Sequence, residues 1–126
     1  MDRFLWITLA GAFGSGARYL VSAWTLHRFG SAFPWGTLAV NVVGCFLICF
    51  VMELAVHTSL VPVTVRYALT TGFLGGLTTY STFNFEALTL FGKGERKKAV
   101  AYLTATLLGG FGAGIVGIVV ARALMR

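Results

Sequence analysis

The chain has 126 residues, of which 57% are hydrophobic and only 11% are charged. Soluble domains carry about 25% charged residues, and a protein this small could not bury so much apolar surface in a water-soluble core. The formal net charge of +6 would suit a nucleic-acid partner, but the basic residues fall mainly between apolar stretches, at the expected level of lipid headgroups. The composition therefore indicates an integral membrane protein with membrane lipid, and no nucleic acid, as its partner.

Runs with few charges predict four transmembrane helices. They cover residues 4–26, interrupted only by Arg18, and the uncharged residues 33–52, 67–85 and 99–121. Each run is close to the ~20 residues that cross ~30 Å of hydrocarbon as a helix. The gaps at residues 27–32, 53–66 and 91–98 are too short for a soluble domain. We therefore expect one all-α transmembrane domain over residues 1–126.

The basic residues leave the orientation of the chain undecided. Four spans place both termini on one side, and the Lys/Arg bias of the loops should set which side that is. The two faces carry four and five basic residues, namely Arg3, Arg66, Arg122 and Arg126 against Arg28, Lys93, Arg96, Lys97 and Lys98. This balance fits insertion in both orientations, with two copies paired as an antiparallel dimer. It fits a weakly biased single orientation equally well.

Glycines are concentrated in the first and fourth spans. They are Gly11, Gly14 and Gly16 in the first span, and Gly109, Gly110, Gly112, Gly114 and Gly117 in the fourth. Small residues let helix backbones approach closely in lipid. The glycines therefore predict either packing of the first span against the fourth within one chain, or a dimer face, or both.

The third span contains the strongest local signal, residues 70–83 with the sequence TTGFLGGLTTYSTF. Two adjacent glycines and a cluster of hydroxyl residues weaken a helix, and hydroxyls can cap the new end. Backbone groups freed at membrane depth are tolerated when they are buried in protein or face an aqueous path. Broken helices near the midplane recur at ion sites. We expect a break here, against the alternative of an unbroken helix with a glycine contact face.

Three polar residues lie in or at the ends of the spans. Ionisable groups in a membrane are costly, so a functional or paired role is the default. Arg18 fits a wet vestibule or a pair with an acid. Asn41 offers N–H donors that suit an anion, although a helix–helix hydrogen bond is as common a use. Glu86 closes the third span and is interpreted as a boundary residue.

Aromatic and sulfur-containing side chains complete the inventory. Tyr80 and Phe83 are three residues apart and share a helix face after the expected break. Their positive ring edges could meet a small anion there, although such an aromatic stripe more commonly serves packing. Cys45 and Cys49 lie inside the second span and are interpreted as small apolar residues. We find no nucleophile–base pair, phosphate loop or metal-ligand spacing, so an enzyme is not expected.

Two motifs resemble the signatures of the Fluc fluoride channels, also called CrcB. They are residues 34–44, PWGTLAVNVVG, and residues 71–83, TGFLGGLTTYSTF. The resemblance extends over the whole chain, including its length, four spans and basic third loop. It implies an antiparallel, dual-topology homodimer in a bacterial inner or plasma membrane, which exports fluoride passively and relieves fluoride toxicity.

The resemblance also assigns roles to residues near the break. Asn41 resembles the pore-lining asparagine and Phe83 the second of two phenylalanines whose edges meet fluoride. Tyr80 stands where the first is usually phenylalanine, which is a departure from the family pattern. Ser81 and Thr82 would add hydroxyls beside the pore.

Further roles implied by the resemblance lie outside the aromatic pair. Gly75 and Thr78 match break positions whose carbonyls bind a structural sodium ion at the dimer centre, and Arg18 resembles a vestibule arginine. Gly110 and Gly114 stand where serine and threonine are expected on a polar track, which puts the fourth helix's share of the ion path in doubt.

Two other functions are weighed against the channel. A small multidrug-resistance-type transporter is also a four-helix, dual-topology dimer, but it needs a membrane-embedded carboxylate in the first helix, where this chain has Arg18. The third possibility is a non-transporting subunit of a larger assembly, which ion flux through the purified protein would distinguish from a channel.

Overall fold

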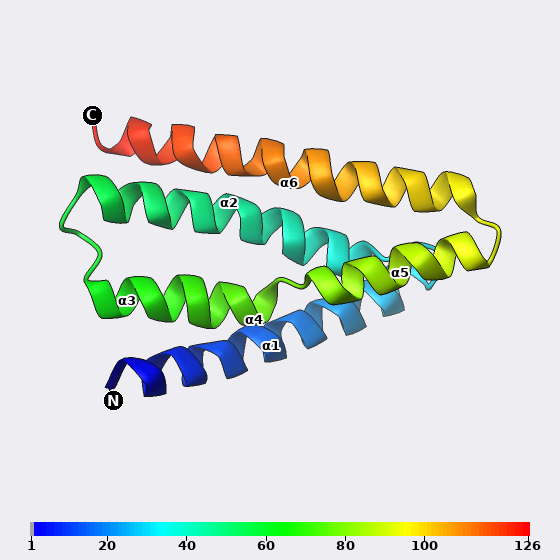
Figure 1. Cartoon of the computed structure of the whole chain (residues 1–126), viewed down its shortest axis with the longest axis horizontal. Helices are drawn as coiled ribbons and strands as arrows, with labels where there is room; N and C mark the ends of the chain where they lie inside the picture. The colour runs from blue at the N-terminus through cyan, green and yellow to red at the C-terminus, as the bar shows by residue number, and fades with distance from the viewer. Residues whose placement is uncertain (1) are drawn as a thin grey trace.

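The computed structural model describes residues 2–126, and every regular element within them is a helix. Four segments run back and forth along the long axis of the molecule (Figure 1). The first, second and fourth are single helices, whereas the third consists of four helical pieces. The elements are α1 (Asp2–Phe29), α2 (Trp35–His57), α3 (Val63–Tyr67), η1 (Ala68–Leu74), α4 (Gly75–Leu77), α5 (Tyr80–Gly92) and α6 (Arg96–Leu124).

The long helices α1, α2 and α6 confirm three of the predicted spans, because each is long and apolar enough to cross a membrane. They extend beyond the uncharged runs, since charged residues such as Arg28 and Glu53 remain helical. Long charged side chains at helix ends can reach the headgroups while their stems lie along apolar surface. The loops accordingly shrink to residues 30–34, 58–62 and 93–95.

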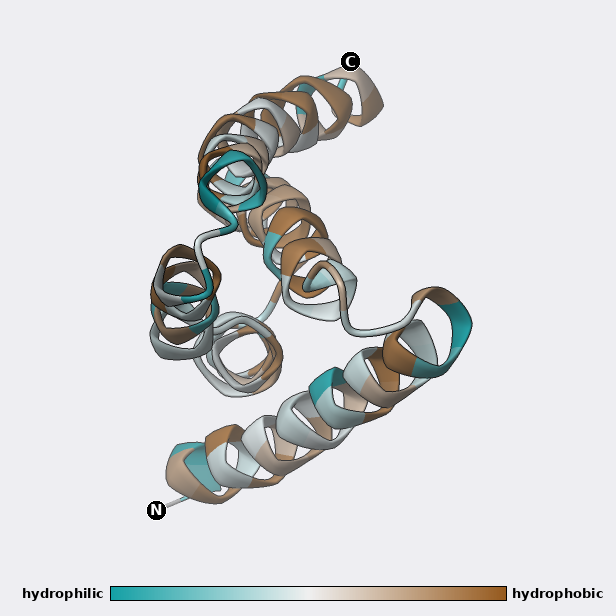
Figure 2. Ribbon diagram, turned by 90° about the vertical axis from the view of Figure 1, so that its right-hand side faces the viewer, coloured by the Kyte–Doolittle hydropathy of each residue, from teal (hydrophilic) through white to brown (hydrophobic). Residues whose placement is uncertain are grey.

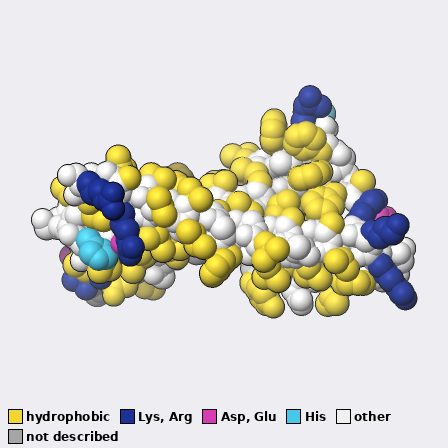
Figure 3. All heavy atoms as spheres, turned by 90° about the horizontal axis from the view of Figure 1, so that it is seen from above, with side chains coloured by type: hydrophobic (Ala, Val, Ile, Leu, Met, Phe, Trp, Pro, Cys, Tyr) yellow, Lys and Arg dark blue, Asp and Glu magenta, His cyan; other side chains and the backbone are white. Residues whose placement is uncertain are grey.

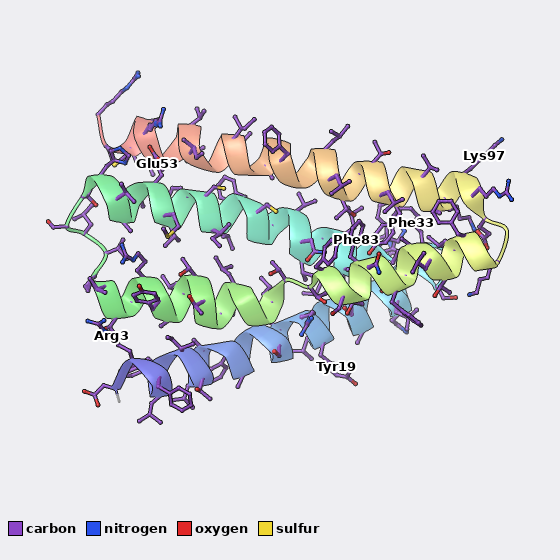
Figure 4. The ribbon with its side chains drawn as sticks, in the orientation of Figure 1. Arg3, Tyr19, Phe33, Glu53, Phe83 and Lys97 are labelled. Carbon is purple, nitrogen blue, oxygen red and sulfur yellow. The ribbon has the colours of Figure 1, made fainter. Side chains whose placement is uncertain are left out.

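Both termini lie at the same end of the molecule, as an even number of passes requires (Figure 1). Arg3 and Glu53 lie at this end and Lys97 at the other (Figure 4). Lys and Arg side chains gather at both ends, with mostly hydrophobic side chains between them (Figure 3). This distribution matches the predicted near-balance of basic residues between the two faces.

The third segment is broken, but not at its glycines. Thr78 (φ −83°, ψ 158°) and Thr79 (φ −156°, ψ 118°) adopt extended backbone between α4 and α5. Gly75 and Gly76 remain helical in α4, which follows η1, a π-helix that the sequence did not predict. A glycine costs a helix only about 1 kcal/mol. Hydroxyl residues offer the backbone competing hydrogen bonds and so end the helix.

The helical glycines of this segment serve close packing against α1. A Cβ added at Gly14 would lie 2.0 Å from the carbonyl oxygen of Phe73, and one added at Gly76 would lie 2.4 Å from the carbonyl oxygen of Gly11. Real Cβ atoms do not approach oxygen so closely, so only glycine fits at these crossings. The third segment therefore has the predicted break, and the alternative of an unbroken helix is wrong, although its glycines do form a contact face.

The predicted packing of the first span against the fourth is wrong. Within residues 2–126, α1 contacts α2 and the first half of the third segment, whereas α6 contacts α2 and α5. Figure 2 shows α1 and α6 on opposite sides of the molecule. All of the α6 glycines except Gly112 face α2 instead, and a Cβ added at Gly117 would lie 2.4 Å from the carbonyl oxygen of Phe46. A small-residue stripe identifies a contact face but not its partner.

The enclosed core is small and most large apolar side chains point outward. One buried cluster comprises Phe83, Ala87, Leu90, Ala99 and Tyr102, and a second comprises Val40, Leu74 and Leu77. By contrast, Phe13 and Phe111 are each 74% exposed. Apolar side chains of this kind are expected to face lipid, which does not penalise their exposure.

Candidate functional site

Asn41 on α2 holds the broken backbone of the third segment. Its Nδ2 donates to the carbonyl oxygen of Thr79 at 3.1 Å, and its Oδ1 accepts from the N–H of Thr79 at 2.8 Å. One amide thus satisfies both backbone groups of an extended residue, which would be costly to leave unpaired at membrane depth. The hydrogen bonds of Asn41 thus join α2 to the extended backbone of the break rather than to another helix, and the second N–H of Asn41 remains a donor for a ligand.

The hydroxyl of Thr79 caps the N-terminus of α5. Its Oγ1 accepts from the N–H of Thr82 at 3.2 Å and donates to the hydroxyl of Thr82 at 3.0 Å. It also forms a hydrogen bond with the hydroxyl of Ser81 at 3.3 Å. The prediction that hydroxyls cap the new helix end is confirmed. Ser81 and Thr82 are exposed and belong to this cap, and their contribution to an ion path stays a prediction.

The same hydrogen bonds deprive the carbonyls of Gly75 and Thr78 of their usual helical donors. In an unbroken helix the Gly75 carbonyl would accept from the N–H of Thr79. The Thr78 carbonyl would likewise accept from the N–H of Thr82. Those two donors turn instead to the side chains of Asn41 and Thr79. The two carbonyl oxygens are thereby left without their helical donors, and they belong to the two residues predicted to bind sodium.

A groove of about 720 Å³ runs over the break, between α2, α6 and the third segment. It unites five of the predicted site residues, which are Asn41, Gly75, Thr78, Tyr80 and Phe83. Within residues 2–126 its lining includes no charged side chain. The lining is mostly apolar, and the groove offers a few neutral hydrogen-bonding groups and aromatic rings to whatever enters it.

Tyr80 and Phe83 have different surroundings although their ring centroids are only 5.9 Å apart. Phe83 is 4% exposed and packs against Tyr102 in a T-shaped contact, with 5.2 Å between the centroids. Tyr80 is 76% exposed. The predicted shared face is confirmed, but this chain encloses only the second of the two rings.

Glu86 joins three helices, a role that the sequence analysis missed. Its Oε1 accepts from the hydroxyl of Thr37 on α2 at 3.0 Å, and its Oε2 accepts from the hydroxyl of Tyr102 on α6 at 2.7 Å. Tyr102 is fully buried and is the ring on which Phe83 packs. The interpretation of Glu86 as a mere boundary residue is therefore wrong. The cost of an unpaired carboxylate at a span end was the available signal.

Thr106 is a second residue that the sequence analysis missed. It lines the groove, is 8% exposed, and its Oγ1 has no hydrogen-bond partner within residues 2–126. Gly110 and Gly114 line the groove one and two turns further along α6. Spacing of four residues places all three on one helix face, so the position of Gly110 could have identified Thr106.

Arg18 lies apart from the groove. It is half-buried on α1 and makes no ion pair within residues 2–126. The predicted alternative of an acid partner is therefore not found in the described part of the chain. Its place in a vestibule stays a prediction.

The fold and the groove together define a class of protein, a multi-pass helical membrane protein whose third membrane segment is interrupted by a polar break. Residues 5–118 match the family model described as CrcB-like protein, Camphor Resistance (CrcB). The match covers most of the chain, and the chain belongs to this family.

The sequences of curated relatives align with this chain over most of their length. A protein of Anaeromyxobacter dehalogenans is 51% identical over 86% of each chain. A protein of Sorangium cellulosum is 46% identical over 99% of this chain and 98% of its own. A protein of Citrifermentans bemidjiense is 44% identical over 98% of this chain and 100% of its own. Each of the three is named a fluoride-specific ion channel FluC.

Proposed function

We propose that this protein is a passive, fluoride-selective channel that releases fluoride from the cytoplasm and so relieves fluoride toxicity. The observation that carries the proposal is the groove, in which a polar break at membrane depth meets uncharged donors and a buried aromatic ring. The names of the relatives support fluoride as the ion. A member of this channel family is not an enzyme.

The lining of the groove suits a small, strongly hydrated anion. Such an ion gives up its water only where several short-range donors replace it. The free N–H of Asn41, the hydroxyl of Thr106 and the ring edge of Phe83 are donors of this kind. None of them carries a full charge, so the ion is not trapped, and conduction needs binding weak enough to release.

We further propose that a second, antiparallel copy of the chain completes the path. Tyr80 is 76% exposed although it borders the groove, so a partner is needed to enclose it. The near-balance of basic residues between the two ends supports both orientations in the same membrane. Two copies would then place two grooves around one central axis, in contact with membrane lipid on their outer faces.

We also propose a structural sodium ion at that axis. The carbonyls of Gly75 and Thr78 have lost their helical donors, and both residues border the open groove. Two such pairs from two chains would supply four neutral oxygens, the ligand type that hard cations prefer. The ion would satisfy these carbonyls and hold the two breaks together, without being transported.

The multidrug-transporter alternative has no observation in its favour. The first helix contains no carboxylate within the membrane, since Asp2 stands at its very start. The family match also falls on the channel family rather than on such transporters.

Fluoride efflux from liposomes containing only this protein tests the proposal. With a potassium ionophore to balance charge, loaded liposomes should release fluoride quickly and retain chloride. Protein-free liposomes provide the background rate. Equal release of both anions would overturn the selectivity, and no release above background would overturn channel function and favour the non-transporting subunit.

A further inference from the structure

The only two cysteines of the chain lie on the wall of the groove. Cys45 and Cys49 are four residues apart on α2, one and two turns beyond Asn41, and all three line the same cavity. Both thiols are free and half-buried. Residues spaced by four on a helix have Cβ atoms about 5–6 Å apart. The two sulfur atoms are therefore near neighbours on one face.

On α6, glycines lie opposite the two sulfur atoms. A Cβ added at Gly110 would lie 3.1 Å from the Sγ of Cys45, and one added at Gly114 would lie 3.0 Å from the Sγ of Cys49. Larger side chains on α6 would press on the sulfur atoms. The two glycines thus leave the space in which both thiols lie.

Thr106 marks the same cavity as a place for a ligand. Its side chain is 8% exposed, it lines the groove, and its hydroxyl has no partner within residues 2–126. A buried hydroxyl without a hydrogen bond costs free energy unless something in the cavity contacts it. This orphan hydroxyl lies on the same α6 face as Gly110, one turn away, and is independent of the thiols.

We propose that Cys45 and Cys49 form a two-sulfur site for a soft, two-coordinate metal ion, and that mercuric ion is its best occupant. The reaction is HgCl2 with two thiols, which gives a bis-thiolate mercury complex, two protons and two chloride ions. Two sulfur–metal bonds form, two S–H bonds and two mercury–chloride bonds break, and no oxidant is needed. Two metal–sulfur bonds of the length known for zinc, about 2.3 Å each, would span a separation that two cysteines one turn apart can reach.

The chemistry of the cavity selects mercuric ion over other thiophilic metals. Two thiolates and one Hg²⁺ make a neutral complex, whereas a monovalent ion such as Ag⁺ would leave a negative charge in a low-dielectric wall. Zinc needs four ligands, and no cluster of three or more His, Cys, Asp or Glu side chains exists within residues 2–126. Soft thiolate ligands favour a soft metal in any case.

Mercury binding is tested on the purified protein in liposomes, treated with HgCl2 and then washed with glutathione. The parent protein should retain one mercury per chain. The variant C45S/C49S should retain none, and C45S and C49S should each lose mercury to glutathione at least about a hundredfold more readily, because the second thiol binds intramolecularly. A parent protein that retains no mercury, or single variants that retain it equally well, would overturn the site.

The flux consequence rests on the proposed channel function, and a separate measurement tests it. Each variant's fluoride efflux with HgCl2 is divided by its own efflux without it. For the parent protein this ratio should be about 0.1 or lower, because the metal bridged by both thiols occupies the groove. For C45S/C49S, which cannot bind the metal, the ratio should stay near one. A control with a single thiol at exposed Ser59 in the C45S/C49S background should also stay near one.

The outcomes separate the two ideas. No efflux from the untreated parent protein overturns the channel function and leaves the mercury measurement standing. Normal efflux from the parent that HgCl2 does not change, with one mercury retained per chain, shows that the thiols lie outside the path and overturns the block.

Discussion

At the scale of single residues, the break is maintained by side chains that replace backbone hydrogen bonds. Asn41 takes both backbone groups of Thr79, and the Thr79 hydroxyl takes the N–H of Thr82. Each of these side-chain hydrogen bonds requires a particular geometry and a particular donor and acceptor. A change that preserves size but reverses one donor should therefore disturb the break.

Asn41→Asp should be more damaging than Asn41→Ser. Aspartate places a carboxylate oxygen 3.1 Å from the Thr79 carbonyl, where the amide now donates, and its charge repels an anion in a low-dielectric path. A barrier raised by about 3 kcal/mol lowers the fluoride efflux rate roughly hundredfold. Serine keeps one donor and should retain partial efflux.

Asn84→Asp is the matched control, because it makes the same chemical change at an exposed position on α5. It should reduce fluoride efflux far less than Asn41→Asp does, because Asn84 does not line the groove and its added charge therefore lies further from the path. Equal efflux from Asn41→Asp and the parent protein would show that Asn41 does not contribute to the path.

Phe83→Ile should abolish fluoride efflux, whereas Tyr80→Phe should have a mild effect. Isoleucine fills part of the same space but has no positive ring edge to offer an anion. Phenylalanine at position 80 keeps the ring, which is 5.9 Å from that of Phe83. The measurement is fluoride efflux per chain from liposomes.

Phe33→Ile separates the ion contact from packing. Phe33 also packs against Tyr102, with 5.5 Å between ring centroids, but does not line the groove. Its loss should reduce thermal stability without abolishing efflux. If Phe83→Ile conducts like the parent protein, the Phe83 ring is packing only.

At the scale of the elements, glycines set how closely helices cross. Gly14 and Gly76 lie where α1 crosses the third segment, and Gly117 lies where α6 meets α2. Gly16 and Gly112 have no neighbour within 4 Å of an added Cβ. Glycines of one helix therefore differ sharply in what a methyl group would meet, although the sequence pattern treats them alike.

Gly14→Ala should destabilise the protein by about 1–3 kcal/mol, the usual cost of overpacking. The added methyl carbon would lie 2.0 Å from the carbonyl oxygen of Phe73, so α1 must move away from the third segment. The free energy of unfolding of the detergent-solubilised protein, followed by tryptophan fluorescence, measures the effect.

Gly16→Ala tests whether that cost comes from the crossing. It lies two residues further along the same helix and meets nothing within 4 Å. Because alanine is the better helix former by up to about 1 kcal/mol, this variant should be as stable as the parent protein or more so. Equal destabilisation by both substitutions would contradict the close-crossing account.

At the scale of the whole molecule, one chain is an open arrangement rather than a closed bundle. Helices α1 and α6 do not touch within the described residues (Figure 2). The groove over the break also has an open side, since Tyr80, which borders it, is 76% exposed. Basic side chains lie at both ends of the molecule (Figure 3), so neither end is marked as the cytoplasmic one.

Reporters fused to the C-terminus should appear on both sides of the membrane, because the basic residues are nearly balanced. Adding about three lysines to the loop at residues 58–62 should bias the chain to one orientation and reduce fluoride efflux. The same number of glutamines is the matched control and should change neither. A single orientation in the unmodified protein, with full efflux, would refute the antiparallel pair.

The sequence by itself determined the membrane class, the number of passes and the presence of a break. These properties depend on local composition measured against the thickness of a bilayer, and on the weak helix preference of glycine and hydroxyl residues. The motifs around Asn41 and Phe83 also sufficed to indicate the family. Such features need no knowledge of which helices meet.

Only the tertiary structure decided the contacts between helices. It placed α1 against the third segment rather than α6, and within the predicted region 70–83 it located the break at Thr78 and Thr79. The hydrogen bonds of Asn41 join residues 38 positions apart in the chain, and that between Glu86 and Thr37 joins residues 49 apart. Partners this distant in the chain are selected by helix packing. A stripe of small residues shows which face of a helix makes a contact, but not which helix it contacts.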